Sequence, residues 1–99
     1  MRIVQIEPIG IGPDDLKKIK TNFKREGHEL IYYDHKPQNE KELIERAKKA
    51  HVIILSNLPL SNNVISQCPD LKMISVAFAG VDHIAMDVCH EKGIVVSNA

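Results

Sequence analysis

The stretch V-A-F-A-G-V-D-H-I, at residues 76–84, places a glycine, a carboxylate and an imidazole directly after an apolar run. Backbone N–H groups at a glycine turn can converge on a carboxylate or phosphate, and Gly80 has no side chain to block a close approach. Asp82 and His83 could form an acid–base pair, but an aspartate there also satisfies backbone N–H groups of the following turn. From the residues alone, an ordinary structural turn is the commoner interpretation.

A second polar segment, Ser56-Asn57, follows the short apolar run at residues 52–55. Its hydroxyl and amide side chains can hold an anion, although loops at strand ends are polar in most proteins. A catalytic nucleophile needs a base held within reach, and nothing local to Ser56 or Cys68 supplies one. We therefore name no catalytic residue and treat both segments as candidates for binding.

The G-I-G sequence at residues 10–12 imitates half of a dinucleotide-binding fingerprint, because it follows a predicted strand and Asp34 ends the next one. Asp15 occupies the third glycine position, however, and Asp14 stands beside it. Two carboxylates at a helix N-terminus would repel a pyrophosphate. The sequence thus predicts no cofactor-binding residue in this chain.

Two further functions are not expected from the ionisable residues. Cys89 and His90 are adjacent on a predicted helix and point in different directions, so we predict no metal site between them. A phosphate-accepting receiver domain would need an acidic pair after the first strand, where only Glu7 stands. It would also need an acid where Ser56-Asn57 follows the third strand, so a phosphoryl donor should leave the chain unmodified.

The composition is that of an ordinary globular domain, with 43% hydrophobic and 26% charged residues among 99. Thirteen basic and thirteen acidic side chains cancel, so no net field attracts nucleic acid or an anionic membrane. No apolar run approaches the ~20 residues of a membrane span. Cys68 and Cys89 fit no disulfide framework, and we expect a reducing, cytoplasmic location.

Strand patterns alternate with helix patterns along the whole chain. The predicted strands cover residues 2–7, 29–34, 52–55, 71–76 and 94–96. Helix starts are expected at Pro13, Asn39, Ser61 and about Ala85, and helix ends at Gly27 and Gly93. This alternation predicts an α/β domain with a parallel sheet in the order 2-1-3-4-5 and helices on both faces.

In such a sheet, ligands bind outside the carboxyl ends of the strands. The segments that meet there are residues 7–12, 34–37, 56–59, 77–83 and 97–99. Both candidate binding segments therefore fall at one edge of the predicted sheet.

Three motifs resemble the N-terminal part of the NAD-dependent D-isomer-specific 2-hydroxyacid dehydrogenases. They are C-P-D-L-K-M-I-S at residues 68–75, A-F-A-G-V-D-H-I at residues 77–84 and E-K-G-I-V-V-S-N-A at residues 91–99. They stand in the family's order and spacing, and the run over residues 51–98 carries the resemblance, whereas the first half of the chain matches only in its β-α pattern. The resemblance implies a flavodoxin-like domain that binds substrate.

The resemblance also implies roles for individual residues. Backbone N–H groups of Ala79 and Gly80 would hold the substrate carboxylate, and Ser56, Asn57 and Phe78 would shape the pocket. Phe78 replaces a small residue common in the family, which would make the pocket narrower or more apolar. The glycine-rich loop, arginine, acid and histidine that carry the family's chemistry have no counterpart here.

The function implied by the resemblance is that of a single lobe, residues 1–99, of an enzyme that moves a hydride between NAD(H) and a 2-hydroxy or 2-oxo acid. We expect a fragment that lacks the Rossmann NAD-binding domain, is catalytically silent alone and self-associates through apolar surface near its last strand. The alternative is a stand-alone, non-enzymatic module that binds a small carboxylate or a partner protein.

Overall fold

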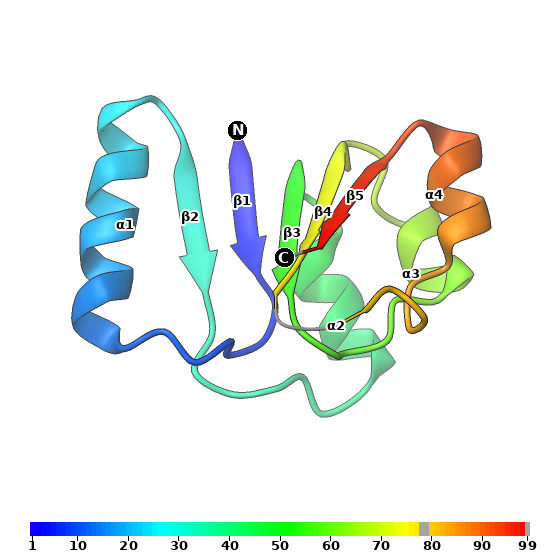
Figure 1. The fold of residues 1–99 in the computed structure, drawn as a ribbon, viewed down its shortest axis with the longest axis horizontal. Helices are drawn as coiled ribbons and strands as arrows, with labels where there is room; N and C mark the ends of the chain where they lie inside the picture. The colour runs from blue at the N-terminus through cyan, green and yellow to red at the C-terminus, as the bar shows by residue number, and fades with distance from the viewer. Residues whose placement is uncertain (78–79, 99) are drawn as a thin grey trace.

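The computed structural model describes residues 1–77 and 80–98, and within them a five-stranded sheet is flanked by helices (Figure 1). The strands are β1 (Arg2–Gln5), β2 (Glu29–Tyr32), β3 (Val52–Leu55), β4 (Met73–Val76) and β5 (Val95–Asn98). The helices are α1 (Pro13–Arg25), α2 (Glu40–Ala47), α3 (Asn62–Ser66) and α4 (Met86–Lys92). Strands and helices alternate in sequence, as the patterns predicted.

The strand order is β2-β1-β3-β4-β5 and every neighbouring pair is parallel, which confirms the predicted 2-1-3-4-5 order. The chain leaves β1 toward β2 and then returns to pair β3 on the other side of β1. The switch in strand order therefore lies between β1 and β3, where ligands bind in sheets of this kind.

One face of the sheet carries the main hydrophobic core. Ile53 of β3 and Ile74 of β4 are fully buried on this face. Helices α2, α3 and α4 cover it, and each contributes apolar side chains to the same cluster, among them Leu43, Val64 and Cys89. The continuous apolar run of β3 is explained by this cover, since a buried strand needs no polar face.

Among the described elements, α1 alone covers the opposite face, where it packs beside the edge strand β2 (Figure 1). Leu16 of α1 and Leu30 of β2 are buried but lie outside the main core cluster. Leu30 pairs in register with Ile3, whose side chain points away from the face that carries Val4. Helices thus flank both faces, as predicted.

Local side-chain contacts explain where two helices begin. The Asn39 Oδ1 atom accepts the Glu42 N–H at 2.8 Å, which confirms the predicted cap of α2. The Glu42 carboxylate reaches back to the N–H of Gln38 at 3.1 Å, one residue before the position that a capping box uses. At α3, the Ser61 hydroxyl accepts the Val64 N–H at 3.3 Å.

Both predicted helix-ending glycines have left-handed backbone, with φ of +84° at Gly27 and +72° at Gly93. The strand limits differ more from the prediction, because an apolar pattern marks burial whereas a strand is defined by pairing. Strand β1 stops pairing with β2 at Gln5, yet Ile6 and Glu7 remain buried beyond it. No described helix has the length and apolar character that a membrane crossing needs.

Candidate functional site

The two candidate binding segments leave the sheet next to each other, at the carboxyl ends of β3 and β4. The Ala77 N–H donates to the Leu55 carbonyl oxygen at 2.8 Å, so the strands are still paired where both segments begin. Of the five predicted site residues, the structure describes Ser56, Asn57 and Gly80. Phe78 and Ala79 lie outside the described residues.

The loops after β3 and β4 are joined by hydrogen bonds. The His83 Nε2 atom lies 2.7 Å from the Ser56 carbonyl oxygen, and the imidazole donates because a carbonyl can only accept. Further along, the Leu60 N–H donates to the His83 carbonyl at 2.9 Å. The Ala85 N–H in turn donates to the Leu60 carbonyl at 3.0 Å. The structure therefore brings the two loops together into one surface at the carboxyl ends of β3 and β4.

This contact changes the interpretation of the Asp82–His83 pair. The sequence allowed an acid–base role, but the His83 Nε2 atom is used to hold backbone of the neighbouring loop. Asp82 itself is exposed. The geometry therefore favours a structural role for the imidazole over proton transfer. The residues alone had favoured a structural role for Asp82 instead, as an acceptor of backbone N–H groups.

A buried carboxylate, Glu7, lies beneath the loop after β3 and is only 1% exposed. Its Oε2 atom accepts the N–H groups of Ser56 and Leu58, both at 2.9 Å. The Nζ atom of Lys36 lies 3.8 Å from Oε1. The segments that follow β1, β2 and β3 thus meet at one carboxylate. Sequence reasoning gave it no such role, although a charged residue directly after the buried Ile6 was a signal for it.

The contacts of Glu7 decide which groups of the loop at residues 56–58 can meet a ligand. The N–H groups of Ser56 and Leu58 point inward to the carboxylate, so they are already engaged. Asn57, between them, is exposed, and Ser56 is half-buried. These two N–H groups are therefore not open to a ligand, whereas the exposed Asn57 between them is.

Gly80 is exposed, and its backbone is not in the left-handed region that favours glycine. A Cβ atom added at this position would have no described atom within 4 Å. Neither backbone conformation nor packing within the described chain therefore requires a glycine here. The open space beside Gly80 is what a ligand approaching the backbone closely would use.

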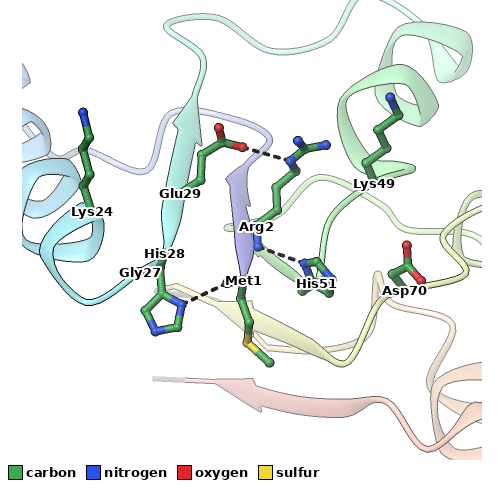
Figure 2. A pocket seen from close by; sticks show the side chains of 9 residues that line it. All are labelled: Met1, Arg2, Lys24, Gly27, His28, Glu29, Lys49, His51 and Asp70. Carbon is green, nitrogen blue, oxygen red and sulfur yellow. Dashed lines mark hydrogen bonds and ion pairs between the residues drawn. The ribbon is translucent and has the colours of Figure 1, made fainter.

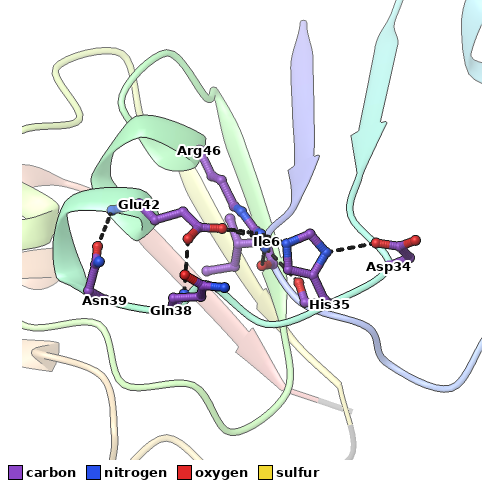
Figure 3. Close-up of polar contacts among 7 residues, drawn as sticks. All are labelled: Ile6, Asp34, His35, Gln38, Asn39, Glu42 and Arg46. Carbon is purple, nitrogen blue, oxygen red and sulfur yellow. Dashed lines mark hydrogen bonds and ion pairs between the residues drawn. The ribbon is translucent and has the colours of Figure 1, made fainter.

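A buried arginine fixes the end of β1 against the loop after β2 (Figure 3). The Nη1 atom of Arg46 donates to the carbonyl oxygens of Ile6 at 2.9 Å and His35 at 2.8 Å. Its Nη2 atom donates to Glu42 Oε1 at 2.7 Å. The guanidinium also lies over the ring of Tyr33, 4.0 Å from the ring centre. Arg46 therefore holds the backbone immediately before Glu7 in place.

The same cluster shifts the acidity of two carboxyl groups. The Gln38 N–H and the Arg46 guanidinium both stabilise the charged form of Glu42 and lower its pKa. The hydrogen bond from His35 to Asp34, 2.7 Å long, lowers the pKa of that carboxyl. Because Arg46 also donates toward His35 Nε2 at 3.0 Å, the imidazole accepts there and carries its proton on Nδ1.

Comparison with known proteins identifies the family. Residues 4–99 match the family described as D-isomer specific 2-hydroxyacid dehydrogenase, catalytic domain. The chain belongs to this family. The resemblance inferred from the three sequence motifs is thereby confirmed, and the match extends through the first half of the chain, where the motifs gave no signal.

Two curated members of the family illustrate the similarity to this dehydrogenase-family chain. A putative 2-hydroxyacid dehydrogenase of Haemophilus influenzae is 28% identical over 98 residues, covering 99% of this chain and 29% of the relative. Glycerate dehydrogenase of Hyphomicrobium methylovorum is 35% identical over 78 residues, covering 76% of this chain and 24% of the relative.

A crystal structure of 3-phosphoglycerate dehydrogenase from Entamoeba histolytica with NAD⁺ bound superposes on this family member with a TM-score of 0.84. The two are 30% identical, and the alignment covers 99% of this chain and 32% of that one. The chain therefore spans about a third or less of the length of the dehydrogenases it matches.

The two cysteines of this dehydrogenase-family chain are buried and unpaired. Burial raises the pKa of the Cys68 thiol to about 11 and also raises the pKa of Cys89. The Cys68 Sγ atom donates to the Val64 carbonyl oxygen at 3.3 Å. Thiols in such surroundings stay protonated at neutral pH and are poor nucleophiles. Within residues 1–77 and 80–98, no group of three or more His, Cys, Asp or Glu is placed to hold a metal ion.

A broad hollow of about 750 Å³ lies at the opposite, amino end of the sheet (Figure 2). Arg2 is paired there with Glu29 at 2.9 Å, and the Arg2 N–H donates to His51 Nδ1 at 2.9 Å. These groups already satisfy one another, and parallel sheets bind ligands at the other end of their strands. The hollow is therefore not assigned to the candidate binding site at the carboxyl ends of the strands.

The glycine turn before α1 does not fit a dinucleotide cofactor. Gly12 caps α1 without a side-chain hydrogen bond, and Asp14 and Asp15 occupy its first turn. Their carboxylates stand where a pyrophosphate would need positive potential. The turn of this family member thus stabilises its own helix dipole with acidic residues and is not built for a nucleotide.

Proposed function

We propose that this chain is the substrate-binding lobe of an enzyme that transfers a hydride between NAD(H) and a 2-hydroxy or 2-oxo acid. The family match over residues 4–99 supports this activity. The observation that carries the proposal is the joined edge at the carboxyl ends of β3 and β4, where the His83 Nε2 atom lies 2.7 Å from the Ser56 carbonyl oxygen. Two loops held in this way form a fixed surface beside the switch in strand order.

The proposed ligand contact is a carboxylate held by backbone N–H groups of Ala79 and Gly80. Ser56, Asn57 and Phe78 would shape the surrounding pocket. Gly80 and Asn57 are exposed, and a Cβ atom at Gly80 would have no described atom within 4 Å, which supports this arrangement. We expect this lobe to bind the acid and not to perform the chemistry, because the Nε2 atom of the nearby His83 is already engaged by the Ser56 carbonyl oxygen.

NAD(H), which supplies or accepts the hydride, would bind in a Rossmann domain outside residues 1–99. Two observations support this division of labour. The acidic first turn of α1 does not fit a dinucleotide, and the relatives are about three times as long as this chain. We therefore expect the chain to form a single lobe that binds the acid and is inactive without its partner domain.

The binding half of the proposal is tested by nuclear magnetic resonance on the 99-residue chain labelled with ¹⁵N. Glycolate, a small 2-hydroxy acid, is titrated beside glycolamide, its uncharged amide. We expect glycolate alone to shift the amide signals of residues 56–58 and 77–83. Equal shifts with glycolamide, or shifts confined to the amino end of the sheet, would contradict a carboxylate site.

The inactivity of the isolated lobe is tested by following NADH absorbance with glyoxylate as the 2-oxo acid. No oxidation of NADH above the uncatalysed rate is expected from the chain alone. Turnover that copurifies with the chain and disappears with a Gly80→Ala variant would show that the lobe is an enzyme by itself, and would overturn this part of the proposal.

We also expect the isolated chain to self-associate through the uncovered face of the sheet. On this face, apolar residues of neighbouring strands lie side by side in register: Ile3, Val52, Met73 and Val95. Val95, on the last strand, is 60% exposed. Sedimentation at two protein concentrations should show a larger species at the higher concentration, and Val95→Glu should abolish this species.

A cytoplasmic location is also proposed, supported by two cysteines that remain unpaired.

A further inference from the structure

We infer that Glu7 is a positioning residue for the substrate-binding loop at residues 56–58. The inference rests on the proposed function and extends it to a side chain that makes no contact with substrate. Glu7 stands two residues after the end of β1, at the switch between β1 and β3, and is 1% exposed. A carboxylate so deeply buried is costly unless specific partners compensate it, so its contacts show what it does.

Those partners are mainly backbone groups of the loop itself. The N–H groups of Ser56 and Leu58 both donate to the Oε2 atom of Glu7 at 2.9 Å. Two donors separated by one residue converge on a single oxygen, so the backbone must curve around it. The residue between them, Asn57, is thereby turned outward, and it is exposed. Hydrogen bonds to a carboxylate are stronger than those to neutral acceptors, which makes this curvature firm.

The second carboxylate oxygen faces a cation from another loop. The Nζ atom of Lys36 lies 3.8 Å from Glu7 Oε1, and the lysine side chain is 62% exposed. This ion pair offsets the negative charge that Glu7 would otherwise present to an anionic ligand at the same edge. Because solvent screens Lys36, the two backbone contacts of Glu7 determine the loop geometry more strongly than the ion pair.

The peptide groups of Ser56 are fixed from two directions. Glu7 accepts its N–H, and the His83 imidazole donates to its carbonyl oxygen at 2.7 Å. Residue 56 therefore has no freedom to rotate about its backbone without breaking one of these contacts. A loop that is ordered before the ligand arrives does not lose that freedom on binding, which raises affinity.

Three variants separate this role from general stability. Glu7→Ala removes the acceptor, whereas Glu7→Gln keeps one oxygen for both N–H groups and replaces the other oxygen, with its ion pair to Lys36, by an uncharged amide nitrogen. Ile6→Val removes one methyl group from the neighbouring buried residue, so it lowers stability without touching the loop. Amide hydrogen exchange of Ser56 and Leu58, glycolate affinity and thermal midpoint are measured for each.

Glu7→Ala should speed amide exchange at Ser56 and Leu58 by at least about tenfold and weaken glycolate binding by about tenfold. Glu7→Gln should restore the exchange rates and the glycolate affinity toward the wild-type values. Ile6→Val should lower only the thermal midpoint. If Glu7→Ala does not fold, Glu7→Asp serves instead. The shorter aspartate side chain cannot reach the loop, so the amides of Ser56 and Leu58 should exchange faster in Glu7→Asp than in Glu7→Gln.

The inference would be overturned if the amides of Ser56 and Leu58 exchange as slowly in Glu7→Ala as in the wild type. It would also be overturned if their exchange becomes faster while the glycolate affinity stays unchanged. Equal effects of Glu7→Ala and Ile6→Val on amide exchange would overturn it as well. Failure of the proposed function looks different, because the wild-type chain would then not bind glycolate at all. The exchange rates measured without ligand would still decide whether Glu7 orders the loop.

Discussion

The His83 Nε2 atom donates a hydrogen bond to the carbonyl oxygen of Ser56 across 2.7 Å, although the two residues are 27 positions apart in the sequence. This bond joins the loop after β3 to the loop after β4. Together with Glu7 beneath the first loop, it makes the carboxyl edge of the sheet a fixed surface. The histidine therefore acts on the candidate site through the loop that it holds.

The length of the side chain at position 83 should decide whether the two loops stay joined. His83→Gln places an amide donor near the position of Nε2, whereas the shorter His83→Asn cannot reach the Ser56 carbonyl. We expect His83→Asn to cost about 1 kcal/mol in the free energy of unfolding and His83→Gln to cost less. Urea unfolding measures both, and equal losses would contradict the assigned contact.

Gly80 should be needed for binding and not for folding. Gly80→Ala is expected to change the free energy of unfolding by less than about 0.5 kcal/mol, because a Cβ atom there meets no described atom within 4 Å. Glycolate affinity should fall by at least about tenfold, since the methyl group occupies the approach to the backbone. Gly12→Ala, a similar change with open space in the turn before α1, is the control and should leave binding unchanged. Unimpaired binding in Gly80→Ala would argue against the carboxylate position.

Arg46 should be among the most sensitive positions outside the hydrophobic core. Arg46→Met leaves the carbonyl oxygens of Ile6 and His35 without their donor, and we expect a loss of about 2–4 kcal/mol in unfolding free energy. Arg25→Met, on the exposed side of α1, is the matched control and should stay within about 0.5 kcal/mol. Chemical denaturation measures the free energy of unfolding of both variants. Similar losses in the two variants would contradict the role assigned to Arg46.

Stability should depend on pH partly through Glu42. Its pKa is lowered in the folded chain by the Gln38 N–H and by Arg46, so the unfolded chain binds a proton more readily. The contribution is fully present above the ordinary glutamate pKa of about 4.3 and is lost as the pH falls through the lowered value. Urea unfolding from pH 7 to pH 3 should show the wild type converging on Glu42→Gln. A difference in unfolding free energy between wild type and Glu42→Gln that stays constant down to pH 3 would contradict the prediction.

Cys68 should resist alkylation in the folded chain. Because burial raises its pKa to about 11, little thiolate forms at pH 8, and the rate should climb only as the pH approaches that value. A cysteine introduced by Ser66→Cys in a Cys68→Ser background lies on the exposed surface and should react at least about 100-fold faster with iodoacetamide. Denaturing urea should remove the difference, and fast labelling of native Cys68 would contradict its burial.

The sequence alone determined the order and type of the elements. Apolar periodicity marked each strand and helix, the Asn39 and Ser61 caps fell where predicted, and Gly27 and Gly93 ended their helices with positive φ. These features follow from contacts within a few residues, which a linear pattern records. The alternation of strand and helix then left few arrangements of the sheet, and the predicted order was correct.

The tertiary structure decided which polar groups form the edge. Glu7 and Ser56 are 49 residues apart, and His83 is 27 residues beyond Ser56, so no local pattern records their contacts. The same holds for Arg46 and Ile6, which are 40 residues apart. The sequence supplies a carboxylate, an imidazole and a guanidinium, but burial beside particular backbone groups determines their roles. Only a folded sheet, which brings the carboxyl ends of distant strands together, can create that burial.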